Sequence, residues 1–299
     1  MCATCGCSDS DWITITDMQT GKHVHLDRGH FSVPKGDVHS HDSPSVHPSP
    51  GHEDHAHAGH EHVHDLHEEH EHAHAPHARS SSVIRVEAEL LARNRLIAER
   101  NRGWFRGREI FALNLMSAPG AGKTTLLERT IRDLKDQLAF HVIEGDQATT
   151  CDAQRISATG CRVIQINTGA ACHLDARMVE AALGQLKPGL GSIVIIENVG
   201  NLVCPALFDL GEEKRVLLAS VTEGDDKPIK YPHMFRAADL VLMTKADLIP
   251  HVPFAVERFS EHLRQVNPHA QLISLSATQG DGLQPWYDWL RKHGNSAGQ

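Results

Sequence analysis

Short runs of apolar residues recur through the second part of the chain, and longer amphipathic stretches separate them. The runs are almost continuous, which is typical of strands that are buried on both faces of a sheet. They predict strands at 110–116, 140–144, 162–167, 192–198, 215–222, 240–244 and 271–276. Apolar residues at helical spacing predict helices at 83–106, 124–137, 174–186, 254–266 and 283–293. This alternation predicts an α/β fold of three layers, in which a mostly parallel sheet is covered by helices on both faces.

The chain before residue 80 does not follow this pattern. From 38 to 79, fourteen of the 24 histidines stand among prolines and acidic residues, with almost no large apolar side chain. Such a tract cannot bury enough apolar surface to offset its ordering entropy, so we expect it to be disordered. The predicted organisation is therefore an N-terminal segment (1–37), a disordered histidine-rich tract (38–79) and a globular domain with a leading helix (80–299).

Composition narrows the class of protein. The formal net charge of −9 is not the basic footprint of a nucleic-acid-binding protein. The chain has no apolar run of about 18 residues, and its N-terminus has no basic flank followed by an apolar stretch. Its seven cysteines, an odd number, argue against a disulfide framework. We therefore expect a soluble, cytoplasmic protein that binds neither nucleic acid nor a membrane.

A glycine-rich segment follows the first predicted strand of the globular part. It reads S-A-P-G-A-G-K-T-T from Ser117 to Thr125 and leads into a predicted helix. Backbone N–H groups of such a turn point at an anion, and the helix N-terminus adds a favourable dipole. We expect Lys123 to reach the β- and γ-phosphates and Thr124 to ligate Mg²⁺. Ser117 stands where the pattern G-x-x-x-x-G-K-[ST] has its first glycine. The predicted nucleoside triphosphate site comprises Gly120, Ala121, Gly122, Lys123, Thr124 and Thr125.

A second motif selects the base. T-K-A-D, which ends at Asp247, follows the next-to-last predicted strand. The Asp247 carboxylate can accept from both the ring N–H and the exocyclic amine of guanine, a donor pair that adenine lacks. Lys245 can pack its stem over the base, and Ser276 and Ala277 resemble the segment whose backbone contacts the guanine oxygen. We therefore predict GTP as the nucleotide. Thr244 replaces the usual asparagine, so we expect the site to lose an amide that braces it.

Acidic residues near two strand ends are candidates for holding Mg²⁺. Asp146 and Asp152 follow one predicted strand, and Glu197 opens the segment E-N-V-G after another. Carboxylates hold Mg²⁺ directly or through water, and the sequence leaves open which of the three is a direct ligand. E-N-V-G is a variant of the D-x-x-G turn that senses the γ-phosphate. Asn201 stands where many signalling GTPases have the glutamine that orients water, so we expect slow hydrolysis. The predicted catalytic residues are Lys123, Thr124, Asp146 and Glu197.

The N-terminal segment and the tract both offer metal ligands. Cys2, Cys5 and Cys7 bring three thiols within a few positions of one another. Thiolates, with the N-terminal amine as a further donor, can bind Ni²⁺ in a planar geometry or Zn²⁺ in a tetrahedral one. The histidines of the tract offer imidazoles on a flexible chain, which favours several weak, exchanging sites. We interpret the tract as a metal store or buffer.

A further group of ligands is predicted inside the globular part. Cys172 and His173 precede a predicted helix, and Cys204 follows the E-N-V-G turn. If both loops emerge on one side of the sheet, two thiolates and an imidazole could meet there, within one chain or across a dimer axis. Cys204 lies just beyond the predicted γ-phosphate sensor, so nucleotide state could open or close the site. Cys151 and Cys161 have no such placement and are interpreted as structural.

Taken together, these motifs resemble the HypB family of hydrogenase nickel-incorporation GTPases. The resemblance covers the M-C-x-x-C-G-C start, the Asn-Arg pairs at 94–95 and 101–102, and nearly all of 111–290. Its most specific segments are E-G-D-Q at 144–147, G-A-A-C-H-L-D at 169–175, E-N-V-G-N-L-V-C-P at 197–205 and T-E-G-D-D-K-P-I-K-Y-P-H-M-F at 222–235. Thr244, and Arg177 where some relatives have a further histidine, depart from the family pattern.

The resemblance implies a P-loop GTPase of the SIMIBI class that forms a homodimer when GTP is bound. It implies a metallochaperone that delivers Ni²⁺ to the large-subunit precursor of [NiFe]-hydrogenase, together with the zinc-binding partner HypA. It assigns a tight nickel site to Cys2, Cys5 and Cys7. It assigns a second site, for nickel or zinc, to Cys172, His173 and Cys204.

Other functions remain open at this point. A urease accessory GTPase also has a histidine-rich start, but it lacks the cysteine cluster and carries C-P-H in place of separate C-H and C. The chain could instead be chiefly a nickel store with a weak GTPase. Deletion of 38–79 would discriminate between this storage role and the metallochaperone role. A P-loop kinase would need an arginine lid, for which there is no clear sequence. Metal affinities and the order of binding and hydrolysis do not follow from the sequence.

Overall fold

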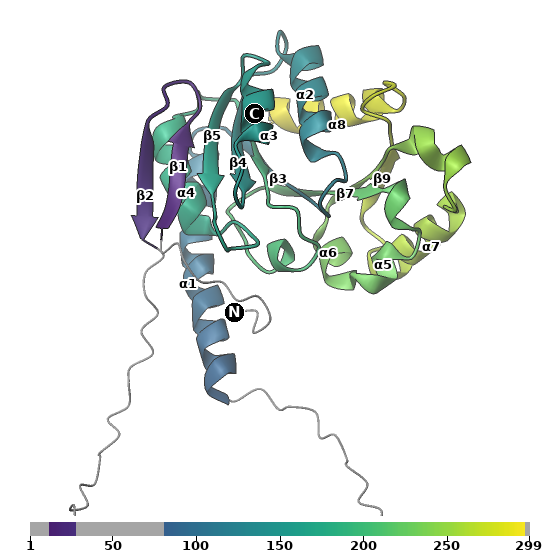
Figure 1. The fold of residues 1–299 in the computed structure, drawn as a ribbon, viewed down its shortest axis with the longest axis horizontal. Coiled ribbons are helices and arrows are strands. Elements are labelled where there is room, and N and C mark those ends of the chain that lie inside the picture. The colour runs from purple at the N-terminus through teal and green to yellow at the C-terminus, as the bar shows by residue number, and fades with distance from the viewer. Residues whose placement is uncertain (1–11, 28–80, 297–299) are drawn as a thin grey trace, which may run out of the picture.

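The computed structural model describes residues 12–27 and 81–296. The cysteines at positions 2, 5 and 7 and the tract at 38–79 lie outside the described residues. The described part is organised around a central sheet, and the first turns of the long helix α1 (Ser81–Arg106) extend away from it (Figure 1).

Nine strands form the sheet, in the order β2-β1-β5-β4-β6-β3-β7-β8-β9. All neighbours from β5 to β9 in this order are parallel, which places their C-terminal ends along one edge. The parallel strands are β3 (Phe111–Ser117), β4 (Phe140–Asp146), β5 (Arg162–Asn167), β6 (Ile193–Glu197), β7 (Lys214–Ser220), β8 (Leu240–Thr244) and β9 (Gln271–Ser274).

Helices cover both faces of the sheet, so the predicted three-layer α/β fold is confirmed. One layer contains α2 (Lys123–Leu134), α3 (Cys151–Ser157) and α8 (Leu283–Ser296). The other contains α1, α4 (Ala176–Leu186), α6 (Pro232–Ala237) and α7 (Val256–Val266). Successive buried residues of a strand, such as Leu115 and Met116, face opposite layers, which explains why the strands read as continuous apolar runs. The shorter helical elements are α5 (Lys227–Lys230), η1 (Cys204–Ala206), η2 (Val221–Glu223) and η3 (Ala246–His251).

The N-terminal hairpin was not predicted. β1 (Trp12–Asp17) pairs antiparallel with β5 and with β2 (His23–Asp27), so the sheet includes residues that the sequence analysis left in the N-terminal segment. Ile13 and Ile15 are buried against α4 and the neighbouring strands. Their alternation with threonines is typical of a strand, but the six residues of β1 lie in a polar stretch with no second strand signal beside them. The hairpin is stabilised by its tertiary contact with β5.

Local capping explains where predicted and observed bounds differ. The strand predicted at 215–222 ends at Ser220, because Ser220 and Glu223 form a reciprocal capping box that turns the chain into η2. The helix predicted from 174 begins at Ala176, since the Asp175 carboxylate accepts from the Met178 N–H and caps it.

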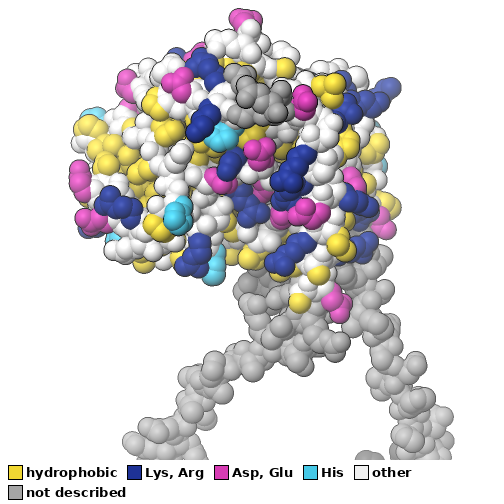
Figure 2. Space-filling model, turned by 180° about the vertical axis from the view of Figure 1, so that it is seen from behind, with side chains coloured by type: hydrophobic (Ala, Val, Ile, Leu, Met, Phe, Trp, Pro, Cys, Tyr) yellow, Lys and Arg dark blue, Asp and Glu magenta, His cyan; other side chains and the backbone are white. Residues whose placement is uncertain are grey.

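Charged side chains of both signs lie on the surface of the described part. On the face shown in Figure 2, acidic and basic side chains lie interspersed. Among the described helices, none is both long enough and apolar enough to cross a membrane.

Candidate functional site

The glycine-rich segment lies between the end of β3 and the start of α2, as the pattern predicts. Gly120 and Gly122 have φ values of +74° and +99°, a left-handed conformation that a side chain disfavours, and this makes the tight turn. The Lys123 ammonium donates to the Ser117 hydroxyl across the loop at 3.0 Å. Serine in place of the first glycine therefore supplies an acceptor that holds Lys123, the lysine predicted to bind phosphate, inside the turn.

One hydrogen bond joins this loop to the end of β6. The Thr124 hydroxyl donates to Glu197 Oε1 at 2.8 Å, and both residues are buried. Burial raises the pKa of Glu197 to about 7, although the Lys123 ammonium opposes the shift. The second carboxyl oxygen of Glu197 is buried and has no hydrogen-bond partner among the described residues. Because a buried carboxyl oxygen seldom stays unpaired, this atom is a strong candidate ligand for a cation held by Thr124.

A second acidic group lies at the C-terminal end of β4 and the N-terminal end of α3. Carboxylate oxygens of Glu144, Asp146 and Asp152 all lie within 4.8 Å of one another. Asp146 accepts from the Ala148 N–H at 2.9 Å and from the Thr149 hydroxyl at 2.9 Å; these bonds outweigh its burial and lower its pKa. Glu144 differs, because burial and then the charges of Glu197, Asp146 and Asp152 raise its pKa to about 9. The structure thus adds Glu144, which the sequence analysis did not select, to the predicted Mg²⁺ residues.

Replacing Glu144 by glutamine should stabilise the metal-free protein at pH 8 and leave its stability at pH 4.5 nearly unchanged. In the unfolded chain this carboxyl ionises near its ordinary pKa of about 4.5, whereas in the folded chain it keeps its proton up to about pH 9. Folding therefore costs free energy that grows as the pH rises between these values, on the order of a few kcal/mol by pH 8. Glutamine has no proton to lose, so the variant escapes this cost.

The measurement is the melting temperature from pH 4.5 to 8.5, without Mg²⁺ or nucleotide. The wild-type curve should fall with pH relative to that of the variant. Glu257→Gln, an exchange at an exposed glutamate on α7 outside the acidic group, is the matched control. Parallel curves for wild type and Glu144→Gln would show that Glu144 is ionised in the folded protein.

The predicted base-binding segments meet beside the phosphate loop. Lys245 has φ +56° and begins the turn that carries Asp247 in η3. The Ala246 N–H donates to Leu275 O at 3.2 Å, which ties this turn to the segment of Ser276 and Ala277. Ser276 is fully buried. The structure therefore brings both predicted segments together at the ends of β8 and β9.

Thr244 lacks the amide of the usual asparagine but makes a hydrogen bond of its own. The Thr244 hydroxyl donates to Ala121 O at 2.8 Å, with both groups buried. A hydroxyl on a strand-end residue reaches the phosphate loop because β8 ends beside it. Threonine thus supplies the link between base site and phosphate loop that the missing amide was expected to provide.

Replacing Thr244 by valine should weaken GTP and GDP binding by about five- to tenfold. Valine keeps the shape of the side chain but leaves the buried Ala121 carbonyl without its donor, at a cost of about 1 kcal/mol or slightly more. The measurement is nucleotide affinity by fluorescence titration. Thr159→Val is the matched exchange, because Thr159 is a half-buried threonine that follows α3 and its hydroxyl also donates to a backbone carbonyl, that of Ile156. Unchanged affinity in Thr244→Val would mean that the hydrogen bond does not support the nucleotide site.

The predicted cysteine–histidine group is assembled within one chain. Cys172 Sγ lies 3.1 Å from Cys204 Sγ and 3.9 Å from His173 Nδ1. The three ligand atoms lie within 4.8 Å of one another, and all three residues are half-buried. Two thiolates and an imidazole at such distances suit tetrahedral coordination of Zn²⁺ or Ni²⁺, with one position open. Of the other cysteines, Cys161 is buried in the core and Cys151 is exposed on α3.

Packing prepares His173 for metal binding. Its ring stacks on Phe208, with the ring centres 3.9 Å apart and the planes at 24°. Burial lowers the pKa of His173 to about 4, so the imidazole is neutral at physiological pH. A neutral imidazole offers its lone pair to a cation without first losing a proton.

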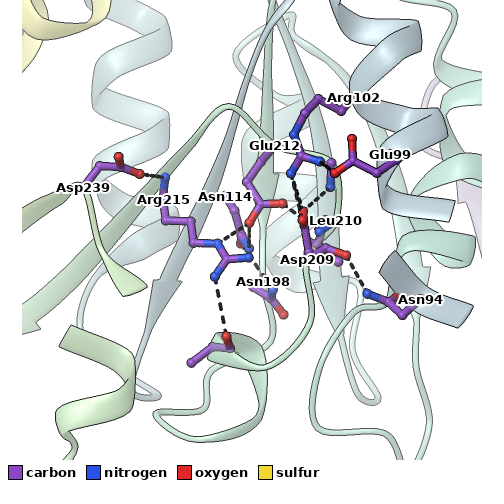
Figure 3. Close-up of polar contacts among 12 residues, drawn as sticks. Asn94, Glu99, Arg102, Asn114, Asn198, Asp209, Leu210, Glu212, Arg215 and Asp239 are labelled. Atoms are coloured by element: carbon purple, nitrogen blue, oxygen red, sulfur yellow. Dashed lines mark hydrogen bonds and ion pairs between the residues drawn. The ribbon is translucent and has the colours of Figure 1, made fainter. Parts of the chain in front are cut away.

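A buried polar network positions the loops that carry these ligands (Figure 3). The Asn198 side-chain oxygen accepts from the N–H groups of Leu174 and Val199, at 3.2 and 3.0 Å. Its amide group donates to Asn114 of β3 at 3.2 Å, and Asn114 donates to Glu212 at 3.4 Å. Asn198 therefore binds the residue directly after His173 to the segment that follows Glu197.

Several of these residues escaped the sequence analysis for identifiable reasons. Glu144 is an acidic residue that directly follows the apolar pair V-I in β4, which is a usable signal. Asn198 lies next to Glu197 in the E-N-V-G segment, but its hydrogen bond to Leu174 depends on the chain after β5 reaching the end of β6, two positions away in the sheet. Nothing in the sequence marks Phe208 as a site residue, because its role follows only from the stacking of its ring on His173. Asn201, which stands where many signalling GTPases have the glutamine that orients water, accepts from the Val203 N–H at 2.7 Å and shapes the turn before Cys204.

The chain is similar to proteins of known families. Residues 111–274 match the family described as CobW/HypB/UreG, nucleotide-binding domain. The hydrogenase maturation factor HypB of Escherichia coli (strain K12) is 45% identical over 293 residues, which cover 97% of this chain and 98% of that protein. HypB of Rhizobium leguminosarum bv. viciae is 53% identical over 215 residues, 72% of each chain. The crystal structure of HypB from Helicobacter pylori in complex with nickel has a TM-score of 0.65 and 38% identity, covering 68% of this chain and 96% of that one.

Proposed function

Because the chain belongs to the CobW/HypB/UreG family, and within it to the HypB hydrogenase maturation factors, we propose that it is a GTP-hydrolysing nickel metallochaperone. GTP binds between β3 and α2, and Ni²⁺ is delivered to the large-subunit precursor of [NiFe]-hydrogenase. A HypA-like accessory protein takes part, and the reaction takes place in the cytoplasm.

The observation that carries this proposal is a single short segment shared by two sites. At one end, Glu197 accepts from Thr124 of the phosphate loop at 2.8 Å. At the other end, Cys204 lies 3.1 Å from Cys172. Between them, a Cβ on Gly200 would lie 3.0 Å from the Cα of Pro119 in the phosphate loop, so the segment packs closely on that loop. A shift at the γ-phosphate therefore moves the thiol ligand.

The acidic residues fit a Mg²⁺ ion. The orphaned buried oxygens of Glu197 and Glu144, with the Thr124 hydroxyl, are hard oxygen donors of the kind this ion prefers. Mg²⁺ bound there would neutralise charge on the β- and γ-phosphates of GTP. Lys123 holds the same phosphates, and Asp146 anchors the loop between β4 and α3 through its backbone contacts. With an asparagine at position 201, we infer slow hydrolysis, so the nucleotide acts as a timer.

The cycle has two states that differ in the Glu197–Cys204 segment. With GTP bound, the segment is ordered against the phosphate loop and the chain forms a homodimer. Val203 and Leu207, each 55% exposed, flank Cys204 and offer apolar surface for that contact. Hydrolysis removes the γ-phosphate, relaxes the segment and moves Cys204 relative to Cys172 and His173. Ni²⁺ or Zn²⁺ is then released to the acceptor.

The test is nickel titration by equilibrium dialysis, in GDP and in a non-hydrolysable GTP analogue. It compares the full chain with a chain that lacks 38–79; the deletion must spare β1 and β2, which belong to the sheet. The proposal predicts that nickel affinity of the sites left after deletion differs by about fivefold or more between the nucleotide states. Equal affinities in the two states would separate metal binding from the nucleotide and overturn the coupling.

The same deletion tests the alternative of a nickel store. Storage predicts that removal of 38–79 lowers nickel capacity while hydrogenase maturation stays intact at ample nickel. A urease-type role predicts activation of urease apoprotein instead, and the separate placement of Cys172–His173 and Cys204 on two loops argues against it.

A further inference from the structure

The outer hairpin of the sheet carries two histidines that face each other. β2 is the edge strand, and its residues alternate: Val24 and Leu26 lie on one face, while His23, His25 and Asp27 lie on the other. Leu26 packs against the core between the sheet and α4. His23 and His25 therefore lie on the opposite face of the hairpin, and both are exposed.

We propose that His23 and His25 form a bidentate imidazole site for a divalent transition-metal cation on this exposed face. The class of ligand follows from the donors, because imidazole suits Ni²⁺, Zn²⁺ and Cu²⁺ and does not suit Mg²⁺. The site is separate from the cysteine–histidine group and needs no nucleotide.

The distance between the rings fits a shared ion. The ring centres lie 5.3 Å apart, with the planes at 64°. An imidazole bound at about 2.1 Å places its ring centre about 3.2 Å from the ion, so two rings at a tetrahedral angle lie about 5.2 Å apart. The side chains thus have the required separation before any ion binds, and little conformational entropy remains to be lost.

The neighbouring strand orients one of the two rings. The Thr14 hydroxyl of β1 lies 3.1 Å from His25 Nδ1, directly across the hairpin. In the tautomer that donates from Nδ1 to this hydroxyl, Nε2 carries the free lone pair. Such a second partner is the usual device that fixes the ring of a metal-binding histidine. Asp27, two residues further on the same face, adds a carboxylate to the local field.

The register places the pair level with the cysteine–histidine loop. His25 is opposite Thr14, and Thr14 is opposite Asn167 at the C-terminal end of β5. Cys172 follows Asn167 by five residues, and two strand spacings make this row about 10 Å wide. In sequence the hairpin also lies between the cysteines at positions 2–7 and the histidine tract. A cation held here would lie at the same edge of the sheet as the C-terminal end of β5, the strand that leads to Cys172.

The experiment is histidine footprinting on the full-length protein. Diethyl pyrocarbonate modifies free imidazoles, and a bound metal protects them. Trypsin cleaves after Lys22 and Arg28, so the peptide 23–28 contains no histidine other than His23 and His25, and the tract cannot obscure it. The peptide 231–236 carries the exposed His233 and is the internal reference. Ni²⁺ is added until modification of the tract peptides no longer changes.

At that point, modification of peptide 23–28 should fall about tenfold, while that of His233 stays constant and Mg²⁺ has no effect. In His25→Asn, His23 should lose its protection, because a single imidazole binds far more weakly than a chelating pair. His269→Asn, at another exposed histidine, is the matched control, and an unchanged melting temperature shows that the hairpin is intact in both variants. Absence of protection by Ni²⁺, or full protection of His23 in His25→Asn, would overturn the bidentate site.

Discussion

Replacing Lys123 by alanine should reduce the rate of GTP hydrolysis by about 10²- to 10³-fold or more. The Lys123 ammonium lies at the start of α2 and is held by the Ser117 hydroxyl at 3.0 Å, in the turn that receives the phosphates. No other described lysine or arginine occupies that turn. Alanine removes the positive charge that offsets the charge developing on the γ-phosphate. The measurement is phosphate release at saturating GTP, so that weaker binding does not hide the loss in turnover.

Lys135→Ala is the matched control, because Lys135 is an exposed lysine at the other end of the same helix. It should keep the wild-type rate. Lys123→Ala should also abolish hydrogenase maturation while nickel stays bound at Cys2, Cys5 and Cys7. Loss of nickel from those cysteines in Lys123→Ala would contradict the proposed division between the terminal site and the GTPase.

Much of the fold could be predicted because its strands are buried on both faces. The strands observed at Arg162–Asn167 and Leu240–Thr244 have the predicted bounds, since near-continuous apolar runs flanked by turns leave little choice. The β1–β2 hairpin could not be predicted in the same way. It has one buried face, and its stability depends on pairing between Ile15 and Ile166, which are far apart in sequence.

The candidate site, like the fold, has features that follow from local sequence and features that depend on contacts between distant residues. Lys123, Thr124 and Glu197 could be selected because strand-to-helix turns of a parallel sheet open on one edge, whatever the details of packing. Their environment could not be foreseen. The raised pKa of Glu144 depends on burial among three other carboxylates, and the brace from Thr244 depends on where β8 ends relative to the phosphate loop. These are properties of the assembled sheet, and no local sequence pattern records them.

The proposed coupling between nucleotide and the internal cysteine–histidine group rests on how its two loops are held. Asn198 joins Leu174, beside His173, to the segment that begins at Glu197. Gly145 permits this arrangement, because a Cβ there would lie 2.9 Å from the Leu174 side chain. Cys172 and His173 are therefore held by the rigid end of the sheet, whereas Cys204 lies at the far end of the segment that contacts the phosphate loop. In the proposed cycle, the ligand that moves is therefore Cys204.

Replacing Cys204 by serine should therefore remove metal from the internal site, with an affinity loss of about 10²-fold or more. Serine has nearly the same shape as cysteine, but its hydroxyl is not a thiolate, and the two remaining ligands come from adjacent residues on one loop. Cys172 lies 3.1 Å from Cys204 Sγ, so its own reactivity reports whether the pair is closed by an ion. The measurement is the rate of Cys172 alkylation by iodoacetamide at saturating Zn²⁺ or Ni²⁺, read by peptide mass.

In the wild type, metal should protect Cys172 strongly, and in Cys204→Ser the protection should be lost. Cys151→Ser is the matched control, since Cys151 is an exposed cysteine on α3 outside the ligand group, and this variant should protect Cys172 as the wild type does. Reading a single peptide separates the internal site from the cysteines and histidines near the N-terminus. GTP hydrolysis in Cys204→Ser should stay within about threefold of the wild-type rate, because the cysteine touches neither Thr124 nor Lys123. Retained protection of Cys172 in Cys204→Ser would show that Cys204 is not a metal ligand. The proposed coupling between the γ-phosphate and the metal site, which depends on movement of Cys204, would then be wrong.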